Sequence, residues 1–379
     1  MRVHADPASV DAAAWDELLA LQAAPTPFLR HAYLSALHTS GSAVRESGWA
    51  PQFITIEQNG VLVAATALYL KSHSYGEYIF DWAWADAYRR HGLAYYPKLL
   101  GAVPFTPVPG TRLLVRDGRW RLRLVDAIGA VAEHGKLSSA HVLFGDDADR
   151  AAFESRGWMI RHGVQFHWTQ DPLQPVSDFN DLLARLQRDK RKKIQQERRR
   201  VAEQGITLQA HGGSAISIAQ WDFFYRCYTL TYAAHNSTPY LTREFFTEMA
   251  STMPEHWVMF VAHRDGAPIA ASLIAVDRQR HAAWGRYWGC IEPAPCLHFE
   301  ACYYQPLAWC IANGIQRFEG GAQGEHKMAR GLLPVPTTSA HWLRDERFAG
   351  AVAGFLAREG EGVDQYVDEL RERNPFKSA

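Results

Sequence analysis

The sequence has little of what marks several common protein classes. Only five of its 379 residues are cysteine, and no CxxC pair occurs, so a disulfide framework is excluded. The longest strongly apolar run, Val61–Leu70, has about half the length that a membrane span needs. Forty basic residues balance forty acidic residues, and no overall charge therefore selects a nucleic acid or a membrane surface as a partner.

Several chemical signatures are also missing. The sequence contains no GxSxG, HExxH, Walker or dinucleotide-binding motif. The spacing of His235, Asn236, His298 and Glu300 fits no common metal site, so we expect no bound metal. The first residues lack a charged stretch followed by an apolar one, and we therefore expect a cytoplasmic chain without a signal peptide.

What the sequence does have is an internal repeat. A shift of 206 positions aligns residues 54–82 with residues 260–288. The shift places Asn59-Gly60 on Asp265-Gly266, and Trp82 on Trp288. Because both dipeptides suit two-residue hairpin turns, each copy predicts a strand, a tight turn, a second strand, a polar connection and a third strand.

The rest of each half follows a similar order. In the first half we predict helices over 10–23, 30–37, 95–100, 120–133 and 149–156, and further strands over 78–84, 140–144 and 159–169. In the second half we predict helices over 179–204, 217–233, 243–251, 298–313 and after Phe348, and strands over 206–210 and 315–319. Asp171–Pro175 is the predicted linker, so the expected units are residues 1–172 and 173–379. Each unit is α+β, with a mixed, mostly antiparallel sheet flanked by helices.

This order of elements resembles the GNAT acyltransferase fold. Two such units in tandem, with a basic helix opening the second, resemble the Fem-type peptidyltransferases. The stretches HGLAYYPKLLGAVPFTPVPGTRLL and EGGAQGEHKMARGL are similar to a proteobacterial branch described as N-acyltransferases of peptidoglycan biosynthesis or recognition. The resemblance implies two tandem GNAT-like units that transfer an acyl or aminoacyl group to an amine, borne by a small molecule or peptide. It implies aminoacyl-tRNA or acyl-CoA as the co-substrate, and no tightly bound cofactor.

A basic segment follows the predicted linker. Residues 185–200, RLQRDKRKKIQQERRR, hold nine basic and two acidic residues. At helical spacing, an interrupted apolar stripe lies beneath the charges, formed by Phe179, Leu182, Leu183, Leu186, Ile194 and Val201. The predicted donor-binding cations are Lys190, Arg191, Lys192 and Lys193. A tRNA backbone, a nucleotide sugar or the phosphates of CoA would suit them equally well, and a solvated charged face is the structural alternative.

A second donor-binding candidate lies in the first half. Arg89–Ala94 fits the pattern [RQ]-x-x-G-x-[GA] of the GNAT acyl-CoA loop. Such a loop turns the chain at a helix N-terminus, so that consecutive amides face a pyrophosphate. We therefore predict Arg89, Gly92 and Ala94 as donor contacts, between a predicted strand and a predicted helix. A plain structural turn is the alternative.

The predicted catalytic segment is Arg317–Lys327, which follows a predicted strand. Its three glycines permit the backbone to approach a ligand closely. Attack by an amine needs a base to take its proton and donors to polarise the carbonyl. Glu319 or Glu325 is the predicted base, Gln323 a predicted donor and Lys327 a predicted substrate contact. An exposed polar loop is the alternative.

Paired aromatic residues suggest an acceptor site. Strand alternation over residues 81–86 would place Asp81 on one face and both tryptophans on the other. Aromatic rings beside charges suit a peptide, a sugar or a base, whereas core packing of the tryptophans is the alternative. The predicted acceptor contacts are Asp81, Trp82, Trp84, Asp86, Tyr95 and Tyr96, with Arg286 and Trp288 at the matching positions of the second half.

Three functions follow from these features. The first is an N-acyltransferase with aminoacyl-tRNA or another large polyanionic donor. The second is an acyl-CoA-dependent N-acyltransferase that uses Arg89–Ala94. The third, from a different class, is a non-catalytic protein that binds a peptidoglycan precursor or RNA on a GNAT scaffold.

Overall fold

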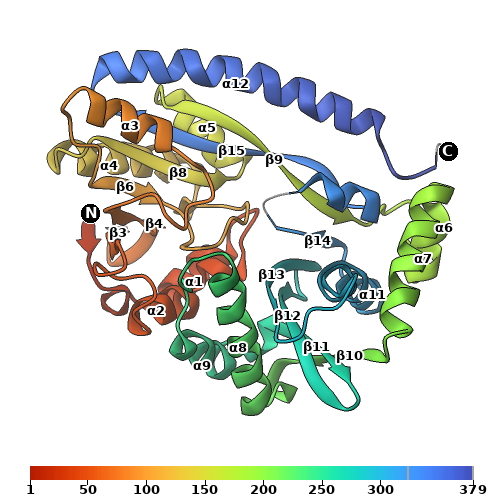
Figure 1. Cartoon of the computed structure of the whole chain (residues 1–379). Coiled ribbons are helices and arrows are strands. Elements are labelled where there is room, and N and C mark those ends of the chain that lie inside the picture. Colours follow the sequence, from red (N-terminus) through yellow and green to blue (C-terminus); the bar gives the residue numbers. More distant parts are fainter. Residues whose placement is uncertain (322–323, 378–379) are drawn as a thin grey trace. The chain divides into compact units, whose positions relative to one another are not determined.

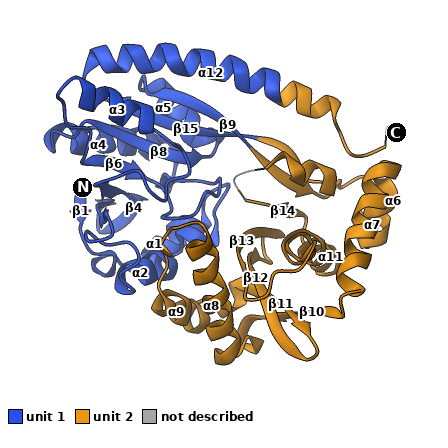
Figure 2. Cartoon of the chain, viewed as in Figure 1, with its two compact units in different colours: residues 1–164, 336–366 blue, residues 165–335, 367–379 orange. Residues whose placement is uncertain are grey.

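The computed structural model describes residues 1–321 and 324–377, and the chain divides into two compact units. Unit 1 comprises Met1–Val164 and Pro336–Tyr366, and unit 2 comprises Gln165–Val335 and Val367–Ala379 (Figure 2). This division differs from the predicted boundary within Asp171–Pro175, because residues 336–366 return to unit 1. Among the described helices, none combines the length and the apolar character needed to cross a bilayer.

Unit 1 contains two sheets with helices packed on them (Figure 1). One sheet has the order β1-β3-β4-β7, formed by Arg2–His4, Phe53–Gln58, Val61–Thr66 and Leu114–Val115. The other has the order β2-β5-β6-β8-β15, formed by Trp49–Pro51, Tyr69–Lys71, Lys98–Gly101, Ser139–Gly145 and the unit 1 part of Leu333–Leu343. The helices are α1 (Ala12–Ala20), α2 (His31–Thr39), α3 (Trp82–Arg90), α4 (Gly118–His134), α5 (Asp147–Ser155) and most of α12 (Glu346–Glu372).

Unit 2 is built on a sheet with the order β10-β11-β12-β13-β14-β9 (Figure 1). Its strands are Ile206–Gly212, Trp257–Arg264, Ala267–Asp277, Ala282–Cys290, Arg317–Glu319 and the unit 2 part of Met159–Thr169. Its helices are α6 (Phe179–Arg185), α7 (Arg188–Ala202), α8 (Ile218–Ala234), α9 (Arg243–Thr252), α10 (Leu297–Phe299) and α11 (Gln305–Ala312), with a π-helical turn at Glu300–Tyr304 and a 3₁₀ turn at Glu325–Arg330.

Local chemistry explains half of the helix starts among the described residues. Side chains accept a backbone N–H at the first turns of six helices, namely those of Asp11, Asp117, Asp146, Asp178, Ser217 and Thr242. These caps agree with the predicted positions of α1, α4, α5, α6, α8 and α9. The predicted helix over 179–204 is instead two helices, because Leu186 has extended backbone between α6 and α7. Strand β15 was not predicted, and one helix, α12, follows it.

The predicted hairpins are confirmed in both units. Asn59-Gly60 has φ values of 52° and 76°, and Asp265-Gly266 has values of 50° and 78°. These positive values are the ones that a two-residue turn requires at both central residues. The turns join β3 to β4 and β11 to β12.

The predicted third strand over 78–84 is wrong, because unit 1 carries an insertion there. In unit 2 the residues 278–281 lead directly from β12 to β13. In unit 1 the residues 72–97, which include α3, separate β5 from β6. Strands β6 and β7 together take the place of the third strand, since β6 pairs with β5 and β7 pairs with β4. The predicted helix over 95–100 is accordingly absent, and β6 occupies the second half of that segment. We call residues 72–97 the inserted segment.

The cores lie between the sheets and the helices of each unit. In unit 1, α4 buries Trp120, Leu124 and Ile128 against strand residues such as Val63 and Leu99. In unit 2, α8 lies directly on β13. A Cβ atom built on Gly289 of β13 would lie 2.0 Å from the carbonyl oxygen of Cys227 in α8. Contact between the two backbones therefore depends on glycine at this position.

We predict that Gly289→Ala destabilises the protein by roughly 3 kcal/mol, because α8 must move to admit a methyl group. The matched control is Gly129→Ala in α4, where a Cβ would meet no atom within 4 Å. The control should stabilise the protein by about 0.5–1 kcal/mol, since alanine favours the helix more than glycine does. Urea denaturation of both variants measures the difference, and equal midpoints would contradict the packing argument.

Candidate functional site

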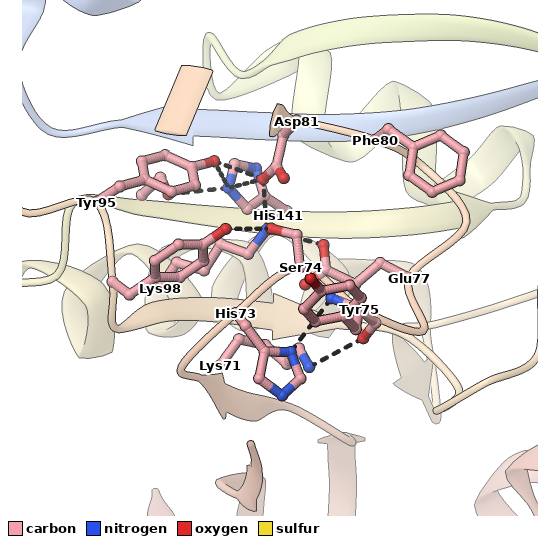
Figure 3. A network of polar contacts seen from close by, with 12 residues as sticks. Lys71, His73, Ser74, Tyr75, Glu77, Phe80, Asp81, Tyr95, Lys98 and His141 are labelled. Atoms are coloured by element: carbon pink, nitrogen blue, oxygen red, sulfur yellow. Dashed lines mark hydrogen bonds and ion pairs between the residues drawn. The ribbon is translucent and has the colours of Figure 1, made fainter. Parts of the chain in front are cut away.

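Unit 1 buries a polar network beneath the inserted segment. Lys71 of β5 lies opposite Lys98 of β6 in the strand register, and both side chains are fully buried. The inserted segment supplies the carboxylates of Glu77 and Asp81, which are only 4% exposed. Two cations and two anions therefore share one solvent-excluded region (Figure 3).

Lys98 is the centre of this network. Its Nζ atom donates to Ser74 Oγ and Glu77 Oε2, each at 2.8 Å, and also to Asp81. Tyr95 donates its hydroxyl to Asp81 Oδ2 at 2.6 Å (Figure 3). Burial opposes the ionisation of Asp81, but Lys98 and His141 outweigh it and hold the pKa of Asp81 well below its usual value.

Lys71 has a weaker set of partners. Its Nζ atom donates to the Tyr75 carbonyl at 3.3 Å and lies 3.6 Å from the centre of the Trp49 ring. Burial lowers the pKa of Lys71 to about 7, although Glu77 opposes the shift. Burial also raises the pKa of Glu77 to about 7, against the effect of Lys98. Both groups therefore titrate near neutral pH, whereas Lys98 and Asp81 stay charged.

Two histidines extend the network to β8 and β15. The Nδ1 atoms of His141 and His341 lie 2.8 Å apart, and His141 Nε2 lies 3.1 Å from the Tyr95 hydroxyl. Burial lowers the pKa of His141 to about 3 and that of His341 well below its ordinary value, so both rings are neutral at physiological pH. Trp84 packs its ring 5.0 Å from the His341 ring. The network therefore joins the inserted segment to four strands of unit 1, namely β5, β6, β8 and β15.

The predicted acceptor residues of unit 1 are not presented on one strand. Residues 82–90 form α3, so the predicted alternation over residues 81–86 is wrong. Asp81 and Tyr95 come together in the buried network, and Tyr96 bonds Ser74 at 2.8 Å beside it. Trp84 is a core residue, Trp82 is 41% exposed, and Asp86 pairs on the surface with Arg89 and Arg90.

The predicted acyl-CoA loop has a different context from the expected one. Arg89–Ala94 lies at the C-terminal end of α3, and a strand follows it instead of a helix. The amides of His91, Gly92 and Leu93 donate to carbonyls of the last helical turn, at 3.2, 3.1 and 2.9 Å. They cannot also face a pyrophosphate. Arg89, Gly92 and Ala94 are exposed, and their placement favours the structural turn.

In unit 2 a parallel strand pair separates beside a polar cluster. β13 and β14 pair from Ala282↔Arg317 to Trp284↔Glu319, and β13 continues beyond that point to Cys290. Glu319 is the last residue of β14 and is 4% exposed. Its carboxylate lies 3.2 Å from Arg317 and 3.9 Å from His167 Nε2. A buried carboxylate thus stands where the two strands diverge.

Lys327 lies next to this carboxylate-bearing strand end. Its side chain is 3% exposed, and its Nζ atom donates to the carbonyl of Gly321 at 2.8 Å. Burial lowers the pKa of Lys327 to about 8. By contrast, Glu325 is exposed, and its carboxylate lies 3.7 Å from Arg373. Gln323 lies outside the described residues.

The turn that carries Lys327 is held by residues that the sequence analysis missed. Arg330 is buried, donates to Glu197 at 3.1 Å and to the His326 carbonyl at 2.6 Å, and lies 3.6 Å from the Phe299 ring. Tyr304 also donates to Glu197. The sequence did contain a signal for Glu197. It follows Ile194 by three positions and precedes Val201 by four, so helical spacing places its carboxylate on the buried face of α7.

The basic helix is docked as predicted. All six residues of the apolar stripe are buried: Phe179, Leu182, Leu183, Leu186, Ile194 and Val201. Lys192 and Lys193 are exposed, whereas Lys190 and Arg191 are half-buried. Lys190 pairs with Asp189 at 2.8 Å. The cations therefore project from the solvent side of α7.

The two predicted acceptor residues of β13 differ in their surroundings. Arg286 is half-buried, and its guanidinium lies 5.0 Å from the Tyr287 ring. Trp288 packs against the apolar cluster that includes Val201 and Leu297. Its ring also lies 5.5 Å from that of His298. Trp288 therefore contributes to the core beneath α7.

Comparisons with known proteins agree with this architecture. A family model described as FemAB-like, peptidoglycan biosynthesis/recognition, matches residues 6–378. The crystal structure of FemX matches with a TM-score of 0.54 and 9% identity, over 93% of this chain and 100% of FemX. L-PGS from Bacillus licheniformis matches with a TM-score of 0.57 and 10% identity, over 94% of this chain and 98% of L-PGS. A search of curated proteins gave no match.

Family and fold together indicate an acyltransferase with an α+β fold in two units. The chain belongs to the FemAB-like family, whose model covers nearly all of it. The predicted family and fold class are thereby confirmed.

We predict that Lys98→Met destabilises the protein by about 3–5 kcal/mol, because Glu77 and Asp81 would be left buried without their cation. The triple variant Lys98→Met, Glu77→Gln, Asp81→Asn should recover at least half of the loss, since it removes the uncompensated charge. The matched control, Lys193→Met, should leave the urea midpoint unchanged because Lys193 is exposed. A triple variant less stable than Lys98→Met would contradict this account of the network.

Proposed function

We propose that this protein transfers an acyl or aminoacyl group from an activated donor to an amine, in a process connected with peptidoglycan. The observation that carries the proposal is the burial of two reactive groups at the exit of β14: the carboxylate of Glu319 ends the strand, and the amine of Lys327 donates to the carbonyl of Gly321, two residues further on. Membership of the FemAB-like family supports the peptidoglycan connection.

The two groups supply complementary chemistry. Glu319 would take the proton from the attacking amine, which then forms a bond to the donor carbonyl carbon. Lys327, as an ammonium, would donate a hydrogen bond to the carbonyl oxygen and then a proton to the departing oxygen or sulfur, as the bond to that atom breaks. The product is an amide, and the leaving group departs neutral. Gly320 and Gly321 lie between Glu319 and the turn that carries Lys327.

The donor we favour is aminoacyl-tRNA or another large polyanion, recognised by Lys190, Arg191, Lys192 and Lys193 on α7. The exposed cations of that helix support this choice, because phosphate contacts dominate the affinity for nucleic acids. Acyl-CoA is the alternative donor. It is less well supported, because the amides of His91, Gly92 and Leu93 in that loop already donate to carbonyls at the end of α3. The acceptor would be an amine on a small molecule or a peptide.

We predict that Glu319→Gln lowers the rate of transfer by about two to four orders of magnitude, because glutamine keeps the size of the side chain but cannot act as the base. The matched control is Glu325→Gln, which alters an exposed carboxylate on the same segment and should retain full activity. The measurement is single-turnover transfer of a radiolabelled group from aminoacyl-tRNA, or from acyl-CoA, to amine acceptors. Activity of Glu319→Gln within about threefold of wild type would exclude this base.

The role of Lys327 predicts a pH dependence. Its pKa is lowered to about 8, so the ammonium is present below that pH and is lost as the pH rises through it. Transfer should therefore fall about tenfold per pH unit above pH 8. Lys327→Met should be slow at every pH and lack that decline, while Lys136→Met, which alters an exposed lysine outside the proposed sites, should keep the wild-type profile. If the transfer rate of Lys327→Met still declines above pH 8, the decline comes from another group. A protein that binds a precursor without any transfer would instead support the non-catalytic alternative.

A further inference from the structure

An open groove of about 540 Å³ lies in unit 2 beside the C-terminal half of α7. Asn180 and Leu183 of α6 line one part of it, and Ile206, Thr207 and Leu208 of β10 line another. α7 contributes Gln195, Arg198, Arg199, Val201 and Ala202, and the π-helical turn and the start of α11 contribute Glu300 and Gln305. The volume is within the range of about 300–1,000 Å³ that small-molecule sites occupy.

The lining combines an apolar floor with polar edges. Leu183, Val201 and Ile206 are buried beneath the groove. Asn180 and Gln195 are exposed and bring amide groups to its edge. An apolar surface with a few amide donors and acceptors suits a flat heterocycle, which needs contact on its face and hydrogen bonds at its rim.

The charge of the groove is positive on balance. Its carboxylate, Glu300, is neutralised by Arg198 at 3.2 Å and accepts a hydrogen bond from Gln305 at 2.7 Å. Arg199 is exposed at the same edge. A planar guanidinium of this kind can stack on a base and also attract a phosphate.

The groove lies on a face of α7 that also carries one of the exposed cations, Lys192, one turn before the first groove residue of this helix. Lys192, Gln195, Arg199 and Ala202 are spaced by three or four residues, so they follow one another along one side of the helix. All four are exposed. Lys192 and Arg199 are separated by about 10 Å along the axis, which is close to the reach of one or two nucleotides. One face of α7 therefore carries the ammonium of Lys192, followed one turn later by the residues that line the apolar groove.

We propose that this groove binds the base of a nucleotide-containing ligand while the cations of α7 bind its phosphates. A simple polyanion would use the cations alone and leave the groove unused. This inference rests on the proposed function in one respect, which is that the donor carries phosphate. It adds that the donor also carries a nucleobase. RNA, CoA and nucleotide sugars share this chemistry.

The test separates the groove from the charges. Thr207→Trp fills the groove from the exposed side of β10, and Ala202→Trp fills it from α7 if the first variant is unstable. Ala210→Trp is the control, because Ala210 is exposed on the same strand but does not line the groove. A fourth variant replaces Lys190, Arg191, Lys192 and Lys193 with Gln. The probes are a labelled single-stranded RNA hexamer, CoA and UDP-N-acetylglucosamine, with inorganic polyphosphate as a ligand that has no base.

We expect the groove-filling variants to weaken binding of at least one nucleotide probe tenfold or more, while polyphosphate binding stays within about twofold. The Gln variant should weaken both kinds of probe and flatten their salt dependence. The probe affected identifies the source of the base. Equal loss for nucleotide and polyphosphate, no loss for either, or no binding of any nucleotide probe to the wild type would overturn the proposal. Groove-dependent binding by a protein that never transfers an acyl group would reject the proposed function and keep this site.

Discussion

The ion pairs of Lys98 are the interaction on which unit 1 depends most. A buried ammonium costs several kcal/mol of lost hydration unless partners replace the water. Here the partners come from the inserted segment. The buried ammonium on β6 and the buried carboxylates of that segment therefore depend on each other for their stability. The network also sets the properties of its neighbours. It keeps Asp81 ionised, and burial beside it leaves His141 and His341 neutral.

The sequence predicted the features that depend on local chemistry. The two hairpins follow from Asn-Gly and Asp-Gly, and the capped helices follow from residues such as Asp117 and Ser217. It failed where the two halves differ. The shift of 206 positions matches Trp82 to Trp288, and the pattern Trp-Ala-Trp-Ala favours a strand. The spacing of four between Trp84 and Tyr88, both buried, indicates the helix that the structure contains.

For unit 2, the sequence predicts Glu319 and Lys327 as candidate site residues, but it does not predict the side chains that hold them in place. Glu319 and Lys327 stand out in sequence, because they flank glycines after a strand. Arg330, Glu197 and Tyr304 do not, because their contacts join segments that are far apart in the chain. The pKa of Lys327 could not be predicted either, since it depends on burial by the fold. Sequence reasoning of this kind therefore identifies reactive groups more easily than it identifies the side chains that position those groups.

The division of the chain has a consequence for the order in which the protein is made. Residues 336–366 complete unit 1, yet a ribosome synthesises them only after nearly all of unit 2. Until then His141 lacks its hydrogen-bond partner His341, and the edge of β8 that will pair with β15 has no neighbouring strand. Unit 1 therefore remains incomplete while unit 2 is synthesised, and during that time its unpaired strand edge can pair with other chains. Protection of that edge during synthesis is a requirement that follows from the topology alone.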